Sequence, residues 1–207
     1  MDEKKRDDKP SFITEARRAQ IIDAAITTLD EIGFANASLA QIARRSGIST
    51  ALISYHFHDK QDLMIQTLQA LLIASTTYVQ ERVRAQKTPR EKLEAFITAS
   101  LAYQGTHPRH NAALVEILFH ARTPDGIPFY KLDDDEADPL NHELQQILQE
   151  GQQTGEFRAF HVVVMASAIR GAISEYMLTP NLLRAVDLET YTTELVTIFN
   201  HMILSAP

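Results

Sequence analysis

The stretch from Ser38 to Phe57, SLAQIARRSGISTALISYHF, decides the fold class because it encodes two short helices separated by a tight turn. Ser38 is an expected N-cap, and Gln41 three residues later completes a capping-box pattern. Gly47 supplies the turn, and Ser49 caps a second helix that runs to about residue 57. Two short helices joined by a turn with glycine form a helix-turn-helix.

Spacing separates the buried and outward faces of these helices. Ile53 and Phe57 lie four residues apart and therefore face the same core. Ala43 lies where the first helix must let the second approach closely. The outward face of the second helix carries small or hydrogen-bonding groups, namely Thr50, Ala51, Ser54 and Tyr55. Such groups suit the major groove of DNA.

Charge along the chain is unevenly distributed. The net charge of −7 argues, taken globally, against a nucleic-acid binder. However, no acidic residue occurs between Glu31 and Asp59, whereas Arg44, Arg45 and two histidines do. Salt screens distant charges over ~8–10 Å, so DNA would meet this local patch rather than the acids elsewhere.

The rest of the chain has the apolar spacing of helices and lacks strand signals. A first helix is expected from Glu15 to Ile32, ended by Gly33. Further helices are expected at 60–86, 90–106, 109–121, 140–153, 159–178 and 187–204, with a surface loop at 122–139. We therefore expect an all-α protein with a three-helix DNA-binding domain at 1–62, including a flexible N-terminal tail, and a helical domain at 63–207.

Composition excludes several classes of protein. The absence of cysteine excludes disulfide scaffolds, Cys-ligated zinc, iron–sulfur clusters and thiol catalysis, and it fits a reducing cytoplasm, where we expect the protein. Apolar runs fall far short of the ~18 residues of a membrane span. The charged start MDEKKRDDKP has no apolar core, so neither a secretory signal nor a membrane partner is expected.

Signals for catalysis or metal binding are missing. There is no G-x-S-x-G, Gly-rich phosphate loop or HExxH, so we expect no enzyme, no catalytic residues and no cofactor. His107 and His110 flank Pro108, which prevents them from sharing a helical face, and no third ligand is near, so no metal is expected. The acidic run at 133–136 lacks the spacing of a calcium loop and is expected to be a solvated surface.

Residues 21–64, IIDAAITTLDEIGFANASLAQIARRSGISTALISYHFHDKQDLM, resemble the DNA-binding domain of the TetR family of bacterial transcriptional regulators. The residues that carry the resemblance are Ile22, Ala24, Ala25, Gly33, Phe34, Ser38, Ile42, Ala43, Gly47, Ile48, Ser49, Tyr55, His56, Phe57, Lys60 and Leu63. Family members hold phosphates at the positions of Ser38, Ser49, Tyr55, His56 and Lys60. They approach base edges at the positions of Gln41, Thr50, Ala51 and Leu52.

Two positions depart from the family pattern. Ser54 stands where members usually have tyrosine, and Ala40 stands where some place a base-reading arginine. Arg17 and Arg18 open the first helix beside the motif, and either DNA or solvent could receive them. The basic residues of the N-terminal tail could form a minor-groove arm, but interspersed acids cancel them and favour a solvated tail.

The resemblance also implies a homodimer and a ligand cavity in the larger domain. Small residues on helix 159–178 and a wide apolar stripe on the last helix fit a dimer interface at Ala168, Gly171, Ala172, Tyr191, Leu195, Ile198, Phe199 and Met202, although the small residues could serve internal packing. Candidate ligand-wall residues, each with ordinary core packing as the alternative, are Tyr103, Glu116, Phe119, His120, Arg122, Phe129, Tyr130, Arg170, Tyr176 and Met177.

The function expected from these observations is that of a sequence-specific repressor. Its partners would be a double-stranded DNA operator, a second copy of the chain and an unknown small-molecule effector that releases it. The alternatives left open are a constitutive or activating regulator without an inducer, and an all-helical binding protein or enzyme with a vestigial helix-turn-helix.

Overall fold

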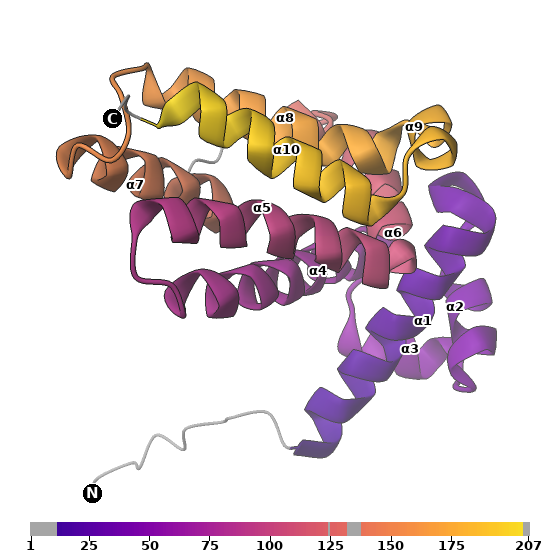
Figure 1. Ribbon diagram of the computed structural model, residues 1–207. Helices are drawn as coiled ribbons and strands as arrows, with labels where there is room; N and C mark the ends of the chain where they lie inside the picture. Colours follow the sequence, from indigo (N-terminus) through magenta and orange to yellow (C-terminus); the bar gives the residue numbers. More distant parts are fainter. Residues whose placement is uncertain (1–11, 124, 132–137, 205–207) are drawn as a thin grey trace, which may run out of the picture. The chain divides into compact units, whose positions relative to one another are not determined.

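The computed structural model describes residues 12–123, 125–131 and 138–204 (Figure 1). The elements in these ranges are α1 Phe12–Asn36, α2 Leu39–Ser46, α3 Thr50–His56, α4 Lys60–Arg84, α5 Pro89–Thr106, α6 Pro108–His120, the 3₁₀ turn η1 Phe129–Lys131, α7 Pro139–Gln153, α8 Val162–Leu178, α9 Pro180–Ala185 and α10 Leu188–Ile203. Within those residues β pairing is limited to two isolated bridges, Arg122–Pro128 and Phe157–Leu204. The expected all-α fold class is confirmed.

Some boundaries differ from those expected. Helix α9 was not anticipated, because its six residues after Pro180 are too few to establish an apolar period. Helix α1 is longer at both ends, but its backbone leaves helical geometry at the expected stop, Gly33, with φ 71° and ψ 168°. The N-terminal tail and the acidic run at 133–136 lie outside the described residues.

Two compact units make up the chain. Among the described residues, the first comprises 12–70, 112–123 and 125–130, and the second comprises 71–111, 131 and 138–204. Helices α4 and α6 therefore each contribute to both units. The functional boundary expected near residue 62 remains a prediction. None of the helices in the described ranges combines the length and apolarity that crossing a bilayer requires.

The core of the first unit joins helices α1 to α4. Ile21, Ile42 and Ile53 are fully buried, and Phe57 is only 1% exposed. On α1 the buried face includes Ile21, whereas the neighbouring Ile22 is half-buried. Truncating such a side chain to alanine typically costs about 2–5 kcal/mol, so this cluster holds the helix-turn-helix together.

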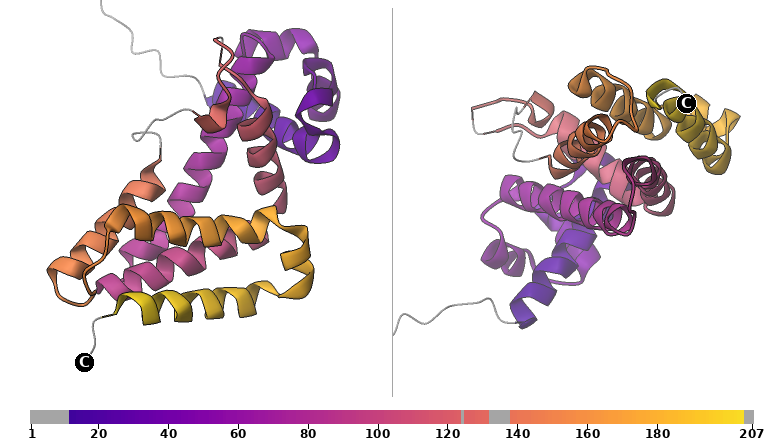
Figure 2. Two further views of the ribbon diagram at one scale, coloured as in Figure 1. Left: turned by 90° about the horizontal axis from the view of Figure 1, so that it is seen from above. Right: turned by 60° about the vertical axis from the view of Figure 1, so that its left-hand side comes forward.

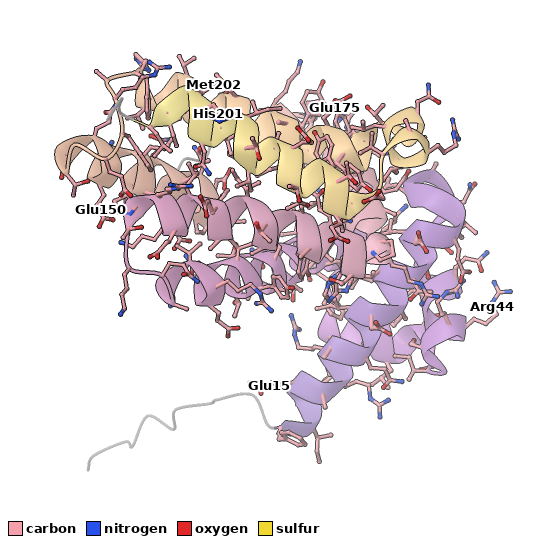
Figure 3. All side chains as sticks on the ribbon, in the orientation of Figure 1. Glu15, Arg44, Glu150, Glu175, His201 and Met202 are labelled. Carbon is pink, nitrogen blue, oxygen red and sulfur yellow. The ribbon has the colours of Figure 1, made fainter. Side chains whose placement is uncertain are left out.

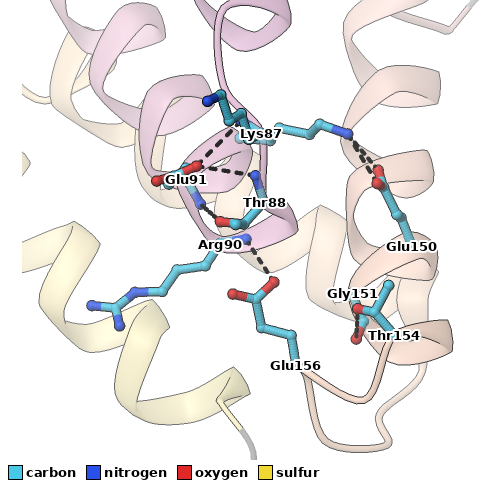
Figure 4. A network of polar contacts seen from close by, with 9 residues as sticks. Lys87, Thr88, Arg90, Glu91, Glu150, Gly151, Thr154 and Glu156 are labelled. Carbon is cyan, nitrogen blue, oxygen red and sulfur yellow. Dashed lines mark hydrogen bonds and ion pairs between the residues drawn. The ribbon is translucent and has the colours of Figure 1, made fainter.

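Helix α5 is central to the second unit, where it packs against α7, α8 and α10 (Figure 2). Thr88 and Glu91 form a full capping box at its start, with Pro89 at the first turn (Figure 4). Two glycines allow close contacts in this unit. A Cβ at Gly105 would lie 2.3 Å from Leu188 Cδ2, and one at Gly151 would lie 2.0 Å from Phe157 Cδ2.

Candidate DNA-binding interface

Local capping bonds shape the helix-turn-helix. Ser38 Oγ accepts the Gln41 amide at 3.2 Å, and Ser49 Oγ accepts the Leu52 amide at 3.2 Å. Gly47 adopts the left-handed conformation, φ 69° and ψ 26°, which directs its N–H to the last carbonyls of α2. The reciprocal half of the expected capping box is replaced, because Gln41 Oε1 accepts a hydrogen bond from Arg44.

The outward face expected for α3 is confirmed. Thr50, Ala51, Ser54 and Tyr55 are all exposed. Tyr55 is 79% exposed, and its ring meets that of His56 edge-on at 5.1 Å between centroids. Leu52 is half-buried beside this surface. A small, polar helix face with one exposed aromatic ring can enter a major groove without steric conflict.

Charge at the interface is lower than the sequence suggests. Arg45 forms a salt bridge with Glu31 of α1, including a 3.0 Å bond from Nη1 to Oε1. Its charge is therefore partly compensated. Arg44 is exposed and points outward from α2 (Figure 3). It was not singled out from the sequence as a contact residue, although the acid-free stretch around it was a usable signal.

Helix α1 supports both helices of the motif. Arg17 Nη1 donates to Gln20 Oε1 at 2.6 Å, and Gln20 Nε2 donates to the Ser46 carbonyl at 2.7 Å, at the end of α2. Arg18 Nη1 donates to the His56 carbonyl at 2.6 Å, at the end of α3. The guanidinium of Arg18 is thus bonded within the protein. Arg17 uses one nitrogen in its bond to Gln20 and keeps other N–H donors for further contacts.

His56 is half-buried at the end of α3. Its burial lowers the pKa of the imidazole below its usual value, and the positive charges of Arg18 and Arg17 lower that pKa further. Both effects favour the neutral ring in the free protein.

Lys60 has an internal partner. Its Nζ donates to the Phe34 carbonyl at 2.7 Å and lies 4.4 Å from the centroid of the Phe34 ring. Partial burial lowers the pKa of this ammonium. From α6, Glu116 Oε2 accepts the Phe34 amide at 2.6 Å. We call the contacts of Lys60 and Glu116 with Phe34 the Phe34 clamp. They direct the charge of Lys60 to α1 in the free protein, and its expected phosphate contact stays a prediction.

The predicted dimer residues divide into two groups. Leu195 and Phe199 are 7% and 5% exposed and belong to the internal core of the second unit, so the expectation that they form an interface is corrected. Tyr191 is half-buried, and its hydroxyl donates to the carbonyl of the half-buried Ala172 at 2.6 Å. The exposed members of the predicted set are Ala168, Gly171, Ile198 and Met202.

The predicted ligand-wall residues are distributed over both units. In the first unit, Phe129 is buried, Phe119 and Tyr130 pair their rings at 5.5 Å, and His120 stacks on Phe34. There too, Arg122 donates to the carbonyls of Phe119 and Ala121, and Glu116 belongs to the Phe34 clamp.

In the second unit, Tyr103 is buried and its hydroxyl lies 2.8 Å from His110 Nδ1. Tyr176 is also buried, Arg170 pairs with Asp138 at 2.6 Å, and Met177 is half-buried. Local partners thus account for many of these side chains.

A surface groove of about 580 Å³ lies between α5 and α10 in the second unit. Its walls are mainly apolar, from Thr98, Ala102, Leu188, Glu189, Thr192, Thr193, Val196 and Thr197. None of the predicted ligand-wall residues lines it. Sequence reasoning missed this groove because its residues belong to two helices about 90 positions apart in the chain.

Comparison with known proteins now adds to this geometry. Residues 21–67 match the family model described as bacterial regulatory proteins, tetR family. Residues 21–67 are a TetR-family segment. The matched TetR segment contains every residue for which a DNA contact was expected except Arg17, which precedes it.

Relatives named HTH-type transcriptional regulator BetI match the same part of the chain. The protein from Burkholderia ambifaria is 43% identical over 89 residues, which are 42% of this chain and 45% of that protein. The one from Paraburkholderia phytofirmans is 41% identical over 93 residues, 44% of this chain and 48% of that protein. The chain thus spans about half the length of the curated relatives it matches.

Solved structures extend the likeness to the remaining helices at the level of fold. FadR from Bacillus subtilis in complex with stearoyl-CoA is 21% identical, covering 87% of this chain and 96% of that one, with a TM-score of 0.70. The ketosteroid transcriptional regulator KstR2 of Mycobacterium tuberculosis is 18% identical, covering 92% and 96%, with a TM-score of 0.71. The helical fold shared with these two regulators therefore extends beyond the matched N-terminal segment.

Proposed function

We propose that the protein is a sequence-specific DNA-binding transcriptional regulator of the cytoplasm, and not an enzyme. The observation that carries the proposal is the exposed, capped α3 of a TetR-family helix-turn-helix. The names of the relatives that match this part of the chain support it.

In this proposal α3 lies in the major groove, and two sets of residues divide the contacts. Gln41, Thr50, Ala51 and Leu52 approach base edges, as in the family. Ser38, Ser49, Tyr55, His56 and Arg17 hold phosphates. Arg44 joins the second set because it is exposed and points outward.

The protein acts as a homodimer in this proposal. A single reading helix per chain needs a partner to read two half-sites, which lie ~34–36 Å apart in successive major grooves. Exposed apolar side chains on α8 and α10 support such an interface. Val163 and Val164 on α8 are 55% and 64% exposed, and Ile198 and Met202 on α10 are 47% and 42% exposed.

Regulation is proposed to be repression, relieved by a small and largely apolar ligand held in the larger helical domain. Helices α4 and α6 offer a route, since each contributes to both units. Two side-chain oxygens in the second unit, Gln104 Oε1 and Glu143 Oε2, are buried without a hydrogen-bond partner among the described residues. Such oxygens are places where a ligand's donor groups could bind.

The energy needed for release is modest. A ligand acts only if it binds the two conformations of the protein differently. A loss of DNA affinity of about 100-fold requires about 2.7 kcal/mol of differential binding. The FadR structure named above shows that this fold can hold an acyl-CoA, but at 21% identity the likeness concerns the fold alone.

DNA binding is tested by selecting duplexes from a random pool with the full chain and by a mobility-shift assay on DNA upstream of its own gene. We expect a selected site made of two half-sites one helical turn apart. Failure to enrich any sequence would contradict the DNA-binding function and favour a binding protein or enzyme with a vestigial motif.

Ligand control is tested separately by screening metabolites for release of the selected duplex. We expect at least one apolar compound to release the DNA. If no compound changes DNA affinity, and a structure of the free protein shows a filled core, the protein is a constitutive regulator. Transcription that rises on adding the protein to its promoter would instead identify an activator.

A further inference from the structure

Arg18 makes three contacts that converge on the end of α3. Its Nη1 donates to the His56 carbonyl at 2.6 Å, and its guanidinium carbon lies 4.7 Å from the centroid of the Phe57 ring. Its Nη2 donates to Gln66 of α4. These partners lie 38 to 48 residues away in sequence, so the contacts belong to the tertiary structure.

Gln66 continues the network back to the turn after α3. Gln66 Nε2 donates to Asp62 Oδ1 at 2.7 Å, and Asp62 Oδ2 accepts the His58 amide at 2.8 Å. The carbonyl of His56 and the amide of His58 are thus both held, one by Arg18 directly and the other through Gln66 and Asp62. The chain between them cannot shift without breaking a hydrogen bond.

Arginine suits this position for physical reasons. A cation at a helix C-terminus interacts favourably with the helix dipole and satisfies a terminal carbonyl. The planar guanidinium can stack on Phe57 while two of its nitrogens bond in different directions, which an ammonium cannot do. The helix being capped is the one whose outward face carries Thr50 and Tyr55.

We propose that Arg18 is a positioning residue for DNA recognition, which sets the orientation of α3 in the major groove without itself contacting DNA. The inference rests on the proposed function. It differs from the role that the sequence left open for Arg18. A DNA contact would act through the charge of Arg18, whereas a positioning residue acts by holding the end of α3 in place. The two roles predict different salt dependence and different specificity.

The experiment compares Arg18→Gln and Arg18→Lys with the full-length wild type, using the duplex selected by the wild type and a scrambled duplex. We expect each variant to lose about tenfold affinity for the selected duplex and little for the scrambled one. The slope of log K against log salt should stay at the wild-type value, since removing a residue that neutralises one phosphate would reduce the slope by ~0.9.

Arg184→Gln is the matched control, because Arg184 is an exposed arginine of α9 in the other unit. It should leave both affinities unchanged. Gln66→Ala tests the same network from its other side, because it removes the acceptor of Arg18 Nη2. It should reduce specific affinity as well, and the double variant Arg18→Gln/Gln66→Ala should lose less than the sum of the two, since the residues share one network.

Several outcomes would overturn the inference. A salt slope reduced by ~0.9 in Arg18→Gln with full rescue by Arg18→Lys would identify a phosphate contact. Equal losses on selected and scrambled DNA, with a lowered melting temperature, would identify a purely structural role. If selection with the wild type enriches no duplex at all, the proposed function itself is contradicted. The failure of this inference and the failure of the proposed function are therefore distinguishable.

Discussion

At the scale of single residues, the helix-turn-helix separates the side chains proposed to read DNA from side chains that form bonds within the protein. Thr50 and Tyr55 are exposed, whereas Arg18 and Lys60 bond inside the protein. The identity of a basic residue therefore does not decide whether its charge reaches DNA. The bonds that the residue makes within the protein decide this, because an ammonium or guanidinium already bonded to a carbonyl must give up that bond to contact a phosphate.

Substitutions on the reading surface should change which sequences are bound. Thr50→Ala and Gln41→Ala are each expected to alter preference at one or two base pairs, at about 1–3 kcal/mol per base pair read. The measurement is a repeat of the random-pool selection with each variant. Uniform weakening on every sequence would show that these residues hold the backbone instead.

Lys60 and Arg44 form a contrasting pair. Lys60→Ala removes the hydrogen bond to the Phe34 carbonyl and should cost about 1 kcal/mol of stability, with the salt slope of DNA binding unchanged. Arg44→Ala removes an exposed cation and should reduce that slope by ~0.9 with little effect on stability. Urea denaturation and binding at several salt concentrations measure both effects. A slope reduced by Lys60→Ala would return that residue to the phosphate contacts.

At the scale of elements, turns and caps decide where each helix begins and ends. Gly47 has a left-handed backbone with no atom within 4 Å of a built Cβ, so its requirement is conformational and not steric. Gly105 and Gly151 show the opposite case, since a methyl group there would meet Leu188 or Phe157. The same residue type thus serves a turn in one unit and close packing in the other.

Gly47→Ala should destabilise the protein by about 1–2 kcal/mol, because a side chain disfavours the left-handed conformation. Gly47→Asn should cost less, since asparagine tolerates that conformation. Thermal denaturation of the two variants is the check. Equal losses of stability would show that the steric bulk of the added atoms, and not backbone strain, sets the cost.

Helix-capping carboxylates should make the fold sensitive to acid. Backbone N–H bonds from Asp62, Thr88 and Thr190 lower the pKa of Asp59, Glu91 and Asp187 respectively. A lowered folded-state pKa means that the stabilisation is present above the ordinary values of 3.8 and 4.5 and is lost as pH falls through the folded-state pKa. Urea midpoints measured from about pH 6 to about pH 3 should fall.

Neutral caps provide the control for this acid effect. Asp187→Asn and Glu91→Gln should lower the midpoint at about pH 6 and flatten its fall below pH 4.5, because the group that titrates has been removed. A midpoint that falls as steeply in these variants as in the wild type would place the acid sensitivity in other carboxylates.

At the scale of the whole molecule, the proposed function requires two copies and a path from ligand to DNA. The Phe34 clamp brings a carboxylate of α6 and an ammonium of α4 to the backbone of one residue of α1, at its amide and its carbonyl. Both helices also contribute residues to the second unit. A change in either helix on ligand binding would therefore reach α1 directly.

The dimer interface is tested on an exposed residue. Ile198→Glu should convert a dimer to a monomer and abolish operator binding, because it places a charge at an apolar contact. Leu183→Glu on α9, also 47% exposed in the wild type, is the matched control and should leave the dimer intact. Light scattering at micromolar concentration measures both, and a monomeric wild type would refute the dimer.

What the sequence by itself determined about this protein is its local structure. The caps at Ser38 and Ser49, the turn at Gly47 and the outward face of α3 follow from neighbours within about four residues, and each agrees with the structure. A family resemblance confined to the same stretch was sufficient to predict the TetR fold. Short-range signals suffice here because hydrogen bonds at helix ends close within one turn.

The tertiary structure alone decided which long side chains turn inward. Arg18 bonds to His56, which lies 38 residues away in the sequence, and Glu116 bonds to Phe34, which lies 82 residues away. Leu195 joins an internal core instead of a dimer face. An apolar stripe shows only that a face is buried, and a charged side chain shows only that a partner is needed. Which partner is met depends on how helices far apart in the chain pack, and periodicity within one helix carries no information about that packing.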